Sequence, residues 1–550
     1  MLVGLDVGGT HVDVVLVNHG EVEEKVKVPT QSDNLLESVL SALSAILKNK
    51  SPEKLHRLVL STTLGTNAIV QGKVDPVGVI VVSGPGIDPE EFSVGDHYVP
   101  ITGYVDHRGR EVKPIKRVEV LNAAKKFEKA GIRQVAVIGK FSVRNPVQEL
   151  TIREILKDKF DHVCLGHLIS GNLNFPRRIA TTYLNSAVQP IHTNFFNSVR
   201  DSLQKHRIEK IPFILKADGG TLNLDASLEQ PVQTILSGPA ASITGALLDP
   251  PDSPTTAVLD IGGTTTDMAI LVDKVPLFEP LGIKIDRYNT LVRSFKTMSV
   301  GIGGDSVVRV EGDRITIGPE RIGPAMAYGG PRPTPTDAII TLGLSADGNR
   351  EKAMEGMKLV ADKIGVSPEK AAAQVFEKTC SEILTALNRM VKEINKKPVY
   401  TIKELLTGYQ VDVKSLLVVG GPAPYFASKL CELSELDAFV AENPEVTNAI
   451  GAACARTTCA VTVFVDTEQG FLLVPEMDYK ERVSQTFTRQ DAIGKAYSLL
   501  RKKALALGCS ENEIEMELVE EMEFNMVRGF YTTGKNIRVK AQIKPGIITA

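Results

Sequence analysis

The amino-acid sequence predicts an α/β protein made of two related lobes. The pattern D-x-G-G-T-x-x-D spans residues 6–13 and recurs at residues 260–267, and each copy lies between two apolar runs typical of strands. Apolar residues recur at helical spacing elsewhere, for example over residues 34–48. Two copies of one strand, turn and strand pattern indicate two half-molecules that face a shared cleft.

Composition excludes several classes of protein. The 550 residues, too many for one core, are 43% hydrophobic and 23% charged, and their formal net charge of −3 predicts no surface for nucleic acid or an anionic membrane. The six cysteines are scattered without a C-x-x-C pair, as free thiols of a reducing compartment are. Neither a leader segment nor an uncharged apolar run of about 18 residues is evident. We therefore expect a cytoplasmic protein.

The two repeated turns are suited to bind an anion. Their glycines, Gly8 and Gly9 in the first copy and Gly262 and Gly263 in the second, allow the backbone to bend and a ligand to approach closely. Successive N–H groups of such a turn can point into one concavity that fits a phosphate. The aspartate before each turn would repel a phosphate, so we expect it to hold a hydrated Mg²⁺ or to orient a water molecule.

Polar residues follow the next predicted strand, residues 55–60. Ligands of open α/β sheets lie outside the carboxyl ends of strands, so Thr62, Thr63, Thr66 and Asn67 are candidates for a polar lining. The alternative is that these hydroxyl groups cap the next helix. Residues 73–140 then read as an α/β insertion or as the rest of the first domain.

A long helix is predicted over residues 174–199. Arg178, near its start, has the planar guanidinium that clamps a carboxylate or a phosphate, although a surface ion pair is the commoner role. The segment before it, residues 161–167, contains two histidines and one cysteine, but its alternation favours a buried strand over a metal site.

Glycine-rich segments of the second half add further candidates. Ser237 is the expected N-cap of a helix that runs to residue 248, and Gly303 and Gly304 open onto a strand as a second backbone nest. Gly420 and Gly421 join a strand to a helix, a build that suits backbone contact with an adenosine and its α-phosphate. Residues 466–550 read as a small α+β module with one amphipathic helix and three strands.

The order of these segments resembles a known group of proteins. The doubled motif is similar to the phosphate-1 and phosphate-2 loops of the ASKHA superfamily, which includes acetate and sugar kinases, Hsp70 and actin. Four further motifs narrow the resemblance to the hydantoinase A/5-oxoprolinase family over about residues 1–465: G-T-N-A at 65–68, S-G-P-A at 237–240, Y-G-G with T-D-A at 328–338, and V-G-G at 419–421. The chain departs from the family where Leu60 and Ser61 replace His-Gly and where Asp305 replaces a glycine.

The resemblance implies the two-lobed, duplicated ribonuclease-H-like fold of the ASKHA type. Its expected parts are an N-terminal lobe at 1–170, a hydantoinase A lobe at 171–465 and the added α+β module at 466–550. ATP would lie between the lobes, with Mg²⁺ held through water by Asp6 and Asp260, and these two aspartates would act in catalysis with Asp267. The implied cofactor-binding residues are Gly8, Gly9, Thr10, Gly262, Gly263, Thr264, Thr265, Gly303, Gly304, Gly420 and Gly421. The implied substrate-binding residues are Thr62, Thr63, Thr66, Asn67, Arg178 and Asp337.

The activity that this resemblance implies is ATP-dependent hydrolysis of a cyclic amide such as hydantoin or 5-oxoproline. Transfer of the γ-phosphoryl group to the amide oxygen would make the carbonyl carbon electrophilic. Fold does not fix function, so three alternatives stay open. The chain is a subunit of an acetone-type carboxylase, it needs a separate B-type subunit for catalysis, or it is a nucleotide-gated binding or assembly module. The sequence leaves open whether it forms a homo-oligomer.

Overall fold

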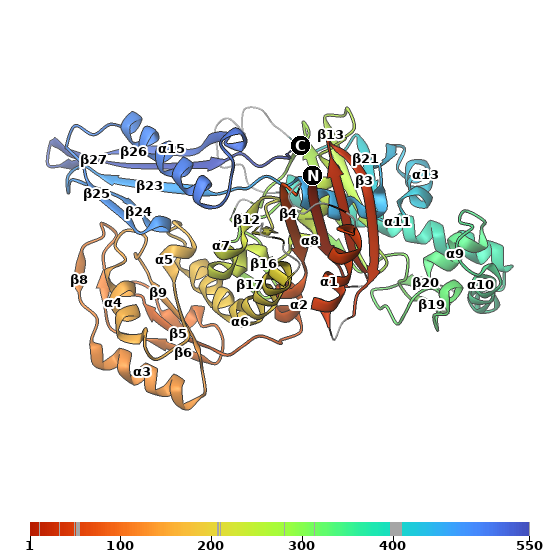
Figure 1. Cartoon of the computed structure of the whole chain (residues 1–550), viewed down its shortest axis with the longest axis horizontal. Coiled ribbons are helices and arrows are strands. Elements are labelled where there is room, and N and C mark those ends of the chain that lie inside the picture. Colours follow the sequence, from red (N-terminus) through yellow and green to blue (C-terminus); the bar gives the residue numbers. More distant parts are fainter. Residues whose placement is uncertain are drawn as a thin grey trace.

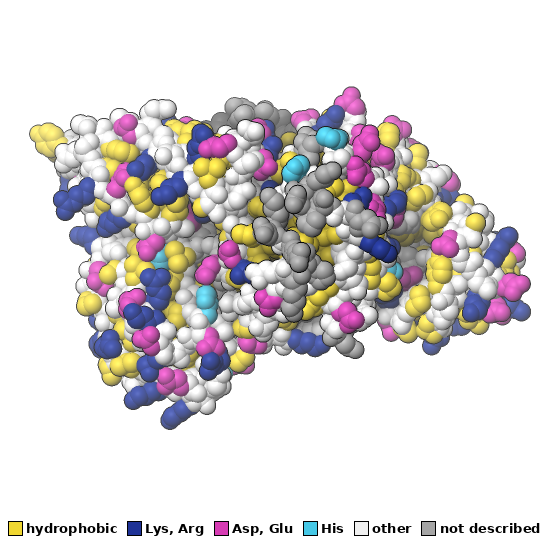
Figure 2. All heavy atoms as spheres, in the orientation of Figure 1, with side chains coloured by type: hydrophobic (Ala, Val, Ile, Leu, Met, Phe, Trp, Pro, Cys, Tyr) yellow, Lys and Arg dark blue, Asp and Glu magenta, His cyan; other side chains and the backbone are white. Residues whose placement is uncertain are grey.

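The computed structural model describes residues 1–9, 11–31, 34–48, 50, 55–205, 208, 211–279, 281–312, 314–396 and 410–548. The described residues form two central lobes, an α/β domain beside the first lobe, and a C-terminal sheet above that domain in the view of Figure 1. Acidic and basic side chains are interspersed over the face shown in Figure 2 and do not gather by sign. Within the described part of the chain, no helix is long and apolar enough to cross a membrane.

The first lobe is built on a six-stranded mixed sheet. Strand β1 pairs antiparallel with β2 and parallel with β4, which in turn pairs parallel with β11. Helix α1 (Leu35–Ile46) covers this sheet with the apolar face that its sequence predicted. The strands, in sheet order, are β12 (Thr221–Asn223), β11 (Phe213–Leu215), β4 (Arg57–Thr62), β1 (Leu2–Val7), β2 (His11–Asn18) and β3 (Glu21–Pro29).

The second lobe repeats this arrangement, which confirms the predicted duplication. Strand β13 pairs antiparallel with β14 and parallel with β21, as β1 pairs with β2 and β4. An antiparallel neighbour of β14 and a parallel neighbour of β21 complete the same order. The strands are β15 (Val275–Pro276), β14 (Thr266–Val272), β13 (Thr255–Ile261), β21 (Ser415–Val419) and β22 (Asp437–Val440), with β18 (Thr297–Val300) beside β14.

Two helices cross between the lobes at very short range. A Cβ atom added at Gly451 of α14 (Thr447–Cys454) would lie 1.9 Å from the carbonyl oxygen of Ala241 in α8 (Ser237–Ala246). A Cβ added at Gly245 would lie 2.2 Å from Thr447 O, and one at Gly4 of β1 would lie 2.1 Å from Ala449 O. Only glycine permits such contacts, so these positions fix how the two lobes approach each other.

Helices outside the crossing complete the second lobe. Three of them form its outer end, at the right of Figure 1, and α13 packs on the sheet behind Gly420. Their bounds are α9 (Pro335–Thr341), α10 (Arg350–Ile364), α11 (Pro368–Asn395) and α13 (Ala423–Ser434). A short hairpin of β19 (Val308–Glu311) and β20 (Arg314–Ile317) lies beside α10 and α11.

An α/β domain is inserted after α2 (Leu64–Val70), as predicted. Its parallel sheet has the order β10 (His162–Leu165), β9 (Gln134–Gly139), β5 (Val77–Val82) and β6 (His97–Pro100). Its helices are α3 (Arg117–Lys129), α4 (Val147–Leu156) and α5 (Gly166–Ile169). The long helix α6 (Phe175–Lys205) packs on this sheet through its first half and on the first lobe through residues such as Phe196 and Val199.

The C-terminal part is a five-stranded antiparallel sheet covered by α15 (Arg489–Ala506). Its strands, in order, are β25 (Tyr479–Arg482), β24 (Phe471–Val474), β23 (Ala460–Asp466), β27 (Tyr531–Ile543) and β26 (Met516–Arg528). The division at residues 170 and 465 remains a prediction. Because α6, β11 and β12 pack with the first lobe, we propose that the second lobe begins at α8.

Candidate functional site

The two repeated turns adopt one geometry. Asp6 lies opposite Asp13 in the first hairpin, and Asp260 lies opposite Asp267 in the second. The N–H group of Gly8 donates to His11 O at 3.0 Å, and the equivalent N–H of Gly262 donates to Thr265 O at 2.9 Å. The sequence pattern therefore encodes the turn itself. Thr10 lies outside the described residues.

Two polar side chains connect the metal-site candidates across the lobes. Asn448, at the start of α14, donates from Nδ2 to Asp6 Oδ2 at 3.3 Å. Ser242 of α8 donates to Asp260 Oδ2, and its Oγ lies 2.8 Å from Asn448 Oδ1. Asn448 also hydrogen-bonds Asp260, so one amide contacts both Asp6 and Asp260, which are 254 residues apart in sequence.

The electrostatics of these aspartates favour a cation. Burial, with repulsion from Asp13 and Asp260, raises the pKa of Asp6 to about 7 against its hydrogen bonds. Burial and the charge of Asp260 raise the pKa of Asp267 to about 7, and burial raises the pKa of Asp260. Asp6 Oδ1 is buried and accepts no hydrogen bond from a described residue. Carboxylates in this state are stabilised when a cation approaches.

The donor set fits a hydrated ion better than a directly ligated one. Among the described residues, no group of three or more His, Cys, Asp or Glu side chains could hold a metal ion. Mg²⁺ keeps several of its waters in proteins and commonly uses only one or two carboxylates. Asp6, with its unpartnered oxygen, and Asp260 match that requirement.

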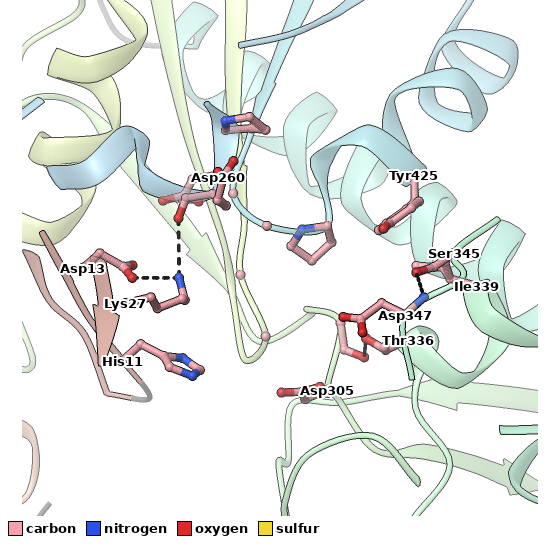
Figure 3. A pocket seen from close by; sticks show the side chains of 18 of the residues that line it. His11, Asp13, Lys27, Asp260, Asp305, Thr336, Ile339, Ser345, Asp347 and Tyr425 are labelled. Atoms are coloured by element: carbon pink, nitrogen blue, oxygen red, sulfur yellow. Dashed lines mark hydrogen bonds and ion pairs between the residues drawn. The ribbon is translucent and has the colours of Figure 1, made fainter. Parts of the chain in front are cut away.

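A cavity of about 400 Å³ opens beside the second turn and lies between the lobes. Figure 3 shows His11, Asp13 and Lys27 entering it from the first lobe, and Asp260, Asp305 and Tyr425 from the second. Lys27 Nζ forms an ion pair with Asp13 at 2.7 Å and donates to Glu445 O at 3.5 Å. The cavity therefore presents the Lys27 ammonium group on the side of the first lobe and Asp260 with the glycine turn on the side of the second.

The glycines of the second lobe differ in what they offer. Gly262, Gly263, Gly304, Gly420 and Gly421 all line the cavity. Gly421 has open space around it, whereas a Cβ at Gly420 would lie 2.3 Å from Ile261 O. Gly420 also has a φ of 95°, which L side chains rarely adopt.

The segment predicted as a second backbone nest supports the turn instead. Gly304 N donates to Gly262 O at 2.9 Å, and Asp305 N donates to Gly263 O at 2.7 Å. Gly303 N donates to Ser306 Oγ, and a Cβ at Gly303 would lie 2.5 Å from Gly262 O. These three N–H groups already have protein acceptors, so the prediction of a backbone nest in this segment is wrong. A role of Gly303 and Gly304 in binding a cofactor remains a prediction.

Several predicted substrate residues lie away from this cavity. Thr62 Oγ1 accepts from Leu64 N, Thr63 Oγ1 donates to Val7 O, Asn67 donates to Thr63, and Thr66 Oγ1 accepts from Leu236 N. The segment thus holds the beginning of α8 against the end of β1. Ser237 is not the N-cap of α8, because Leu236 occupies that position and Ser237 Oγ binds the backbone of Thr62.

The side chains of Arg178 and Asp337 also form hydrogen bonds within the protein. Arg178 is fully buried and donates to the carbonyl oxygens of Asn172, Gly139 and Lys140 at 2.6, 2.5 and 2.8 Å. Asp337 closes a capping box with Thr334 and accepts from the N–H groups of Met326 and Ala327. The structure does not bring either side chain to the cavity.

Sequence reasoning missed several residues at the site. Asn448 and Ser242 lie in segments rich in small residues and glycine, and Lys27 lies in an alternating strand. Tyr328 and Tyr425 line the cavity, and Tyr328 donates to Asp347 Oδ2 at 3.1 Å. A single amide in the otherwise small and apolar segment 446–453 was the one signal that pointed to Asn448.

Family models decide the relationship that the motifs suggested. The hydantoinase/oxoprolinase model matches residues 178–461, and the model of the N-terminal region of the same family matches residues 2–160. The chain belongs to the hydantoinase/oxoprolinase family. Within this family, the chain is 23% identical over 497 residues to the caprolactamase subunit alpha of Pseudomonas jessenii, covering 82% of this chain and 69% of the relative.

Two further comparisons place this family member. It is 23% identical over 483 residues to the acetophenone carboxylase gamma subunit of Aromatoleum aromaticum, covering 77% of this chain and 63% of the relative. The crystal structure of the ATP-dependent caprolactamase from Pseudomonas jessenii superimposes with a TM-score of 0.72 at 18% identity, covering 100% of this chain and 87% of that chain. The duplicated ASKHA fold expected from the motifs is thereby confirmed.

Proposed function

We propose that this chain uses MgATP to hydrolyse a cyclic amide, a hydantoin or a 5-oxoproline-like lactam. The observation that carries the proposal is the pair of D-x-G-G-T-x-x-D hairpins whose aspartates, Asp6 and Asp260, both bind Asn448 beside one cavity. The name of the relative caprolactamase subunit alpha, from an enzyme described as ATP-dependent, supports this class of reaction.

Each part of the cavity has a role in this proposal. Gly262 and Gly263 would cradle the phosphates, and the adenosine would extend past Gly421 toward Tyr425. Asp6 and Asp260 would hold hydrated Mg²⁺, which, when bound, neutralises charge on the phosphates. Phosphoryl transfer depends mostly on positioning and charge stabilisation, so these contacts would supply most of the rate enhancement.

The chemistry explains why the lactam needs activation. Transfer of the γ-phosphoryl group to the amide oxygen weakens the carbon–oxygen bond and makes the carbonyl carbon electrophilic. Water then adds to that carbon, the ring carbon–nitrogen bond breaks, and phosphate leaves. The products are a ring-opened carboxylate with a free amine or urea group, ADP and inorganic phosphate.

The test is phosphate release from MgATP by the purified chain with hydantoins, 5-oxoproline or simple lactams. We expect one of these compounds to stimulate release. Asp260→Ala should lower that rate about a hundredfold or more while the fold remains intact, as for loss of one preorganised electrostatic contact. Asp252→Ala, at an exposed aspartate of the same lobe, is the matched control. Unchanged turnover in Asp260→Ala would refute the role of the second hairpin.

A second candidate function is that of a subunit of an ATP-dependent carboxylase. The similarity to the acetophenone carboxylase gamma subunit favours it. A small ketone together with bicarbonate would then stimulate phosphate release, and a lactam alone would not. The same assay therefore separates the two reactions.

We further propose that turnover involves a B-type partner subunit. Both named relatives are described as subunits of larger enzymes. If the purified chain binds ATP but no compound stimulates turnover, addition of the partner should restore it. Light scattering of the chain alone tests whether it forms a homo-oligomer.

A further inference from the structure

The C-terminal sheet presents two chemically different faces. Side chains alternate along a strand, and on β27 the residues Ile537, Val539 and Ala541 are fully buried in the core under α15. Arg538, Lys540 and Gln542 occupy the intervening positions and face the rest of the molecule.

Two contacts hold the polar face against other parts of the chain. Arg538 Nη2 donates to Asn172 Oδ1 at 3.2 Å, just before α6. Arg293 of the second lobe donates from Nη1 to Gln542 Oε1. The C-terminal sheet, the entry to α6 and the second lobe therefore meet along β27, below the sheet in Figure 1.

A cavity of about 410 Å³ lies at this junction, separate from the cavity between the lobes. Its volume is similar to that of the first cavity, which is large enough for a small organic ligand. Much of its lining is apolar and comes from Leu173, Phe278, Leu281, Leu291 and Val519.

Two cations line the same cavity without ionic partners. Lys540 Nζ forms no hydrogen bond or ion pair with a described residue, and Glu520, opposite it on β26, is used by Arg538 at 2.8 Å. Burial, and then the charge of Arg293, lower the pKa of Lys540. Arg293 stacks on the ring of Phe278, 4.2 Å from its centroid, and likewise forms no ion pair with a described residue.

The acidic groups nearby do not neutralise this pair. Glu279, the acidic side chain among the lining residues, is bound to Lys296 at 2.7 Å. Glu476 and Glu520 act on Lys540 only as weaker, opposing charges. Asp218, whose charge acts on Arg293, forms an ion pair with Lys216 at 3.2 Å. Two cations that form no direct ion pair with a described residue in a partly buried site are costly, and an anion that binds both would recover that cost through charge-assisted hydrogen bonds.

We propose that this second cavity binds a small organic carboxylate, with its carboxylate on Lys540 and Arg293 and its hydrocarbon part against Leu173, Phe278 and Leu281. The apolar walls favour an organic anion over inorganic phosphate, which would leave them hydrated. Because three parts of the chain form the walls, bound ligand also stabilises their packing. This proposal does not depend on the reaction at the first cavity.

The test uses hexanoate, its neutral isostere hexanamide and inorganic phosphate, titrated into the complete chain by calorimetry without nucleotide. We expect hexanoate to bind at least about tenfold more tightly than hexanamide or phosphate, as for charge-assisted hydrogen bonds. Lys540→Met should abolish this preference. Lys535→Met, which removes a lysine of the same strand that pairs with Glu523 outside the cavity, should preserve it.

Three results would overturn the proposal. The first is equal binding of hexanoate and hexanamide by the unaltered chain, which requires no variant to fold. The second is tighter binding of phosphate than of hexanoate. The third is an unchanged preference in a Lys540→Met variant with an unchanged melting temperature, or absence of hexanoate binding altogether.

Discussion

Removal of the Asn448 side chain should shift the pH dependence of ATP turnover. In Asn448→Ala, Asp6 loses the hydrogen bond that reaches it from Nδ2 at 3.3 Å. A long hydrogen bond to a charged acceptor contributes about 1.5 kcal/mol, which corresponds to about one pKa unit. The pKa of Asp6, already raised to about 7 by burial, should therefore rise further.

The expected readout is the acidic limb of kcat/KM for MgATP. This limb reports the free enzyme, and the ionised form of Asp6 is the one that would hold hydrated Mg²⁺. Activity should therefore fall below pH about 7 in the unaltered chain and below pH about 8 in Asn448→Ala. Asn18→Ala, which removes an exposed amide that donates to Glu23 at 2.8 Å, is the control. An acidic limb at the same pH in Asn448→Ala and in the unaltered chain would refute the role given to Asn448 in holding Asp6 ionised.

Three further substitutions test the energetics of the fold. Asp6→Asn should raise the free energy of unfolding by up to about 4 kcal/mol above pH about 7, because ionisation of the buried carboxylate opposes folding. This gain should vanish as the pH falls toward 3.8, and a shift of the melting temperature that does not depend on pH would contradict the reasoning. Gly451→Ala should cost about 1–3 kcal/mol in denaturant unfolding because its Cβ would meet Ala241 O at 1.9 Å, whereas Gly494→Ala, with open space in α15, should be neutral or stabilising. Arg178→Met should cost about 3–5 kcal/mol and leave KM unchanged; normal stability with a raised KM would restore its predicted role toward substrate.

Local sequence determines those parts of the site that could be predicted. The Asp-x-Gly-Gly turns depend on strand alternation and on glycine within eight residues, so the hairpins and their opposed aspartates follow from the pattern. Repetition of the pattern then indicates a second lobe with the same strand order. The duplication can be recognised in the sequence because the same short motif and the same flanking apolar runs occur twice.

Contacts between distant segments could not be predicted in the same way. Ser242 and Asn448 are 206 residues apart, and only the crossing of α8 and α14 brings them together. Arg178 was assigned to a ligand because nothing in its own helix reveals the three carbonyl oxygens that surround it. Asp337 illustrates the same limit, since a capping aspartate and a ligand-binding aspartate look alike in sequence.

Strand continuity was also underestimated in the C-terminal sheet. Residues 513–519 and 523–530 were interpreted as two strands, whereas the structure has the single strand β26 over residues 516–528. The register of β26 against β27 shifts between Leu518 and Glu520, and such a bulge interrupts the pairing without ending a strand.

The glycine-mediated crossing of α8 and α14 limits how the cavity between the lobes can open. Because the backbones at Gly4, Gly245 and Gly451 approach their neighbours too closely to admit a Cβ atom, we expect sliding of α14 against α8 and β1 to cause collisions. We therefore expect any separation of the lobes to be a rotation about this crossing. Because displacement in a rotation grows with distance from the axis, a small rotation at the crossing would move the distant rim of the cavity much farther than the residues at the crossing.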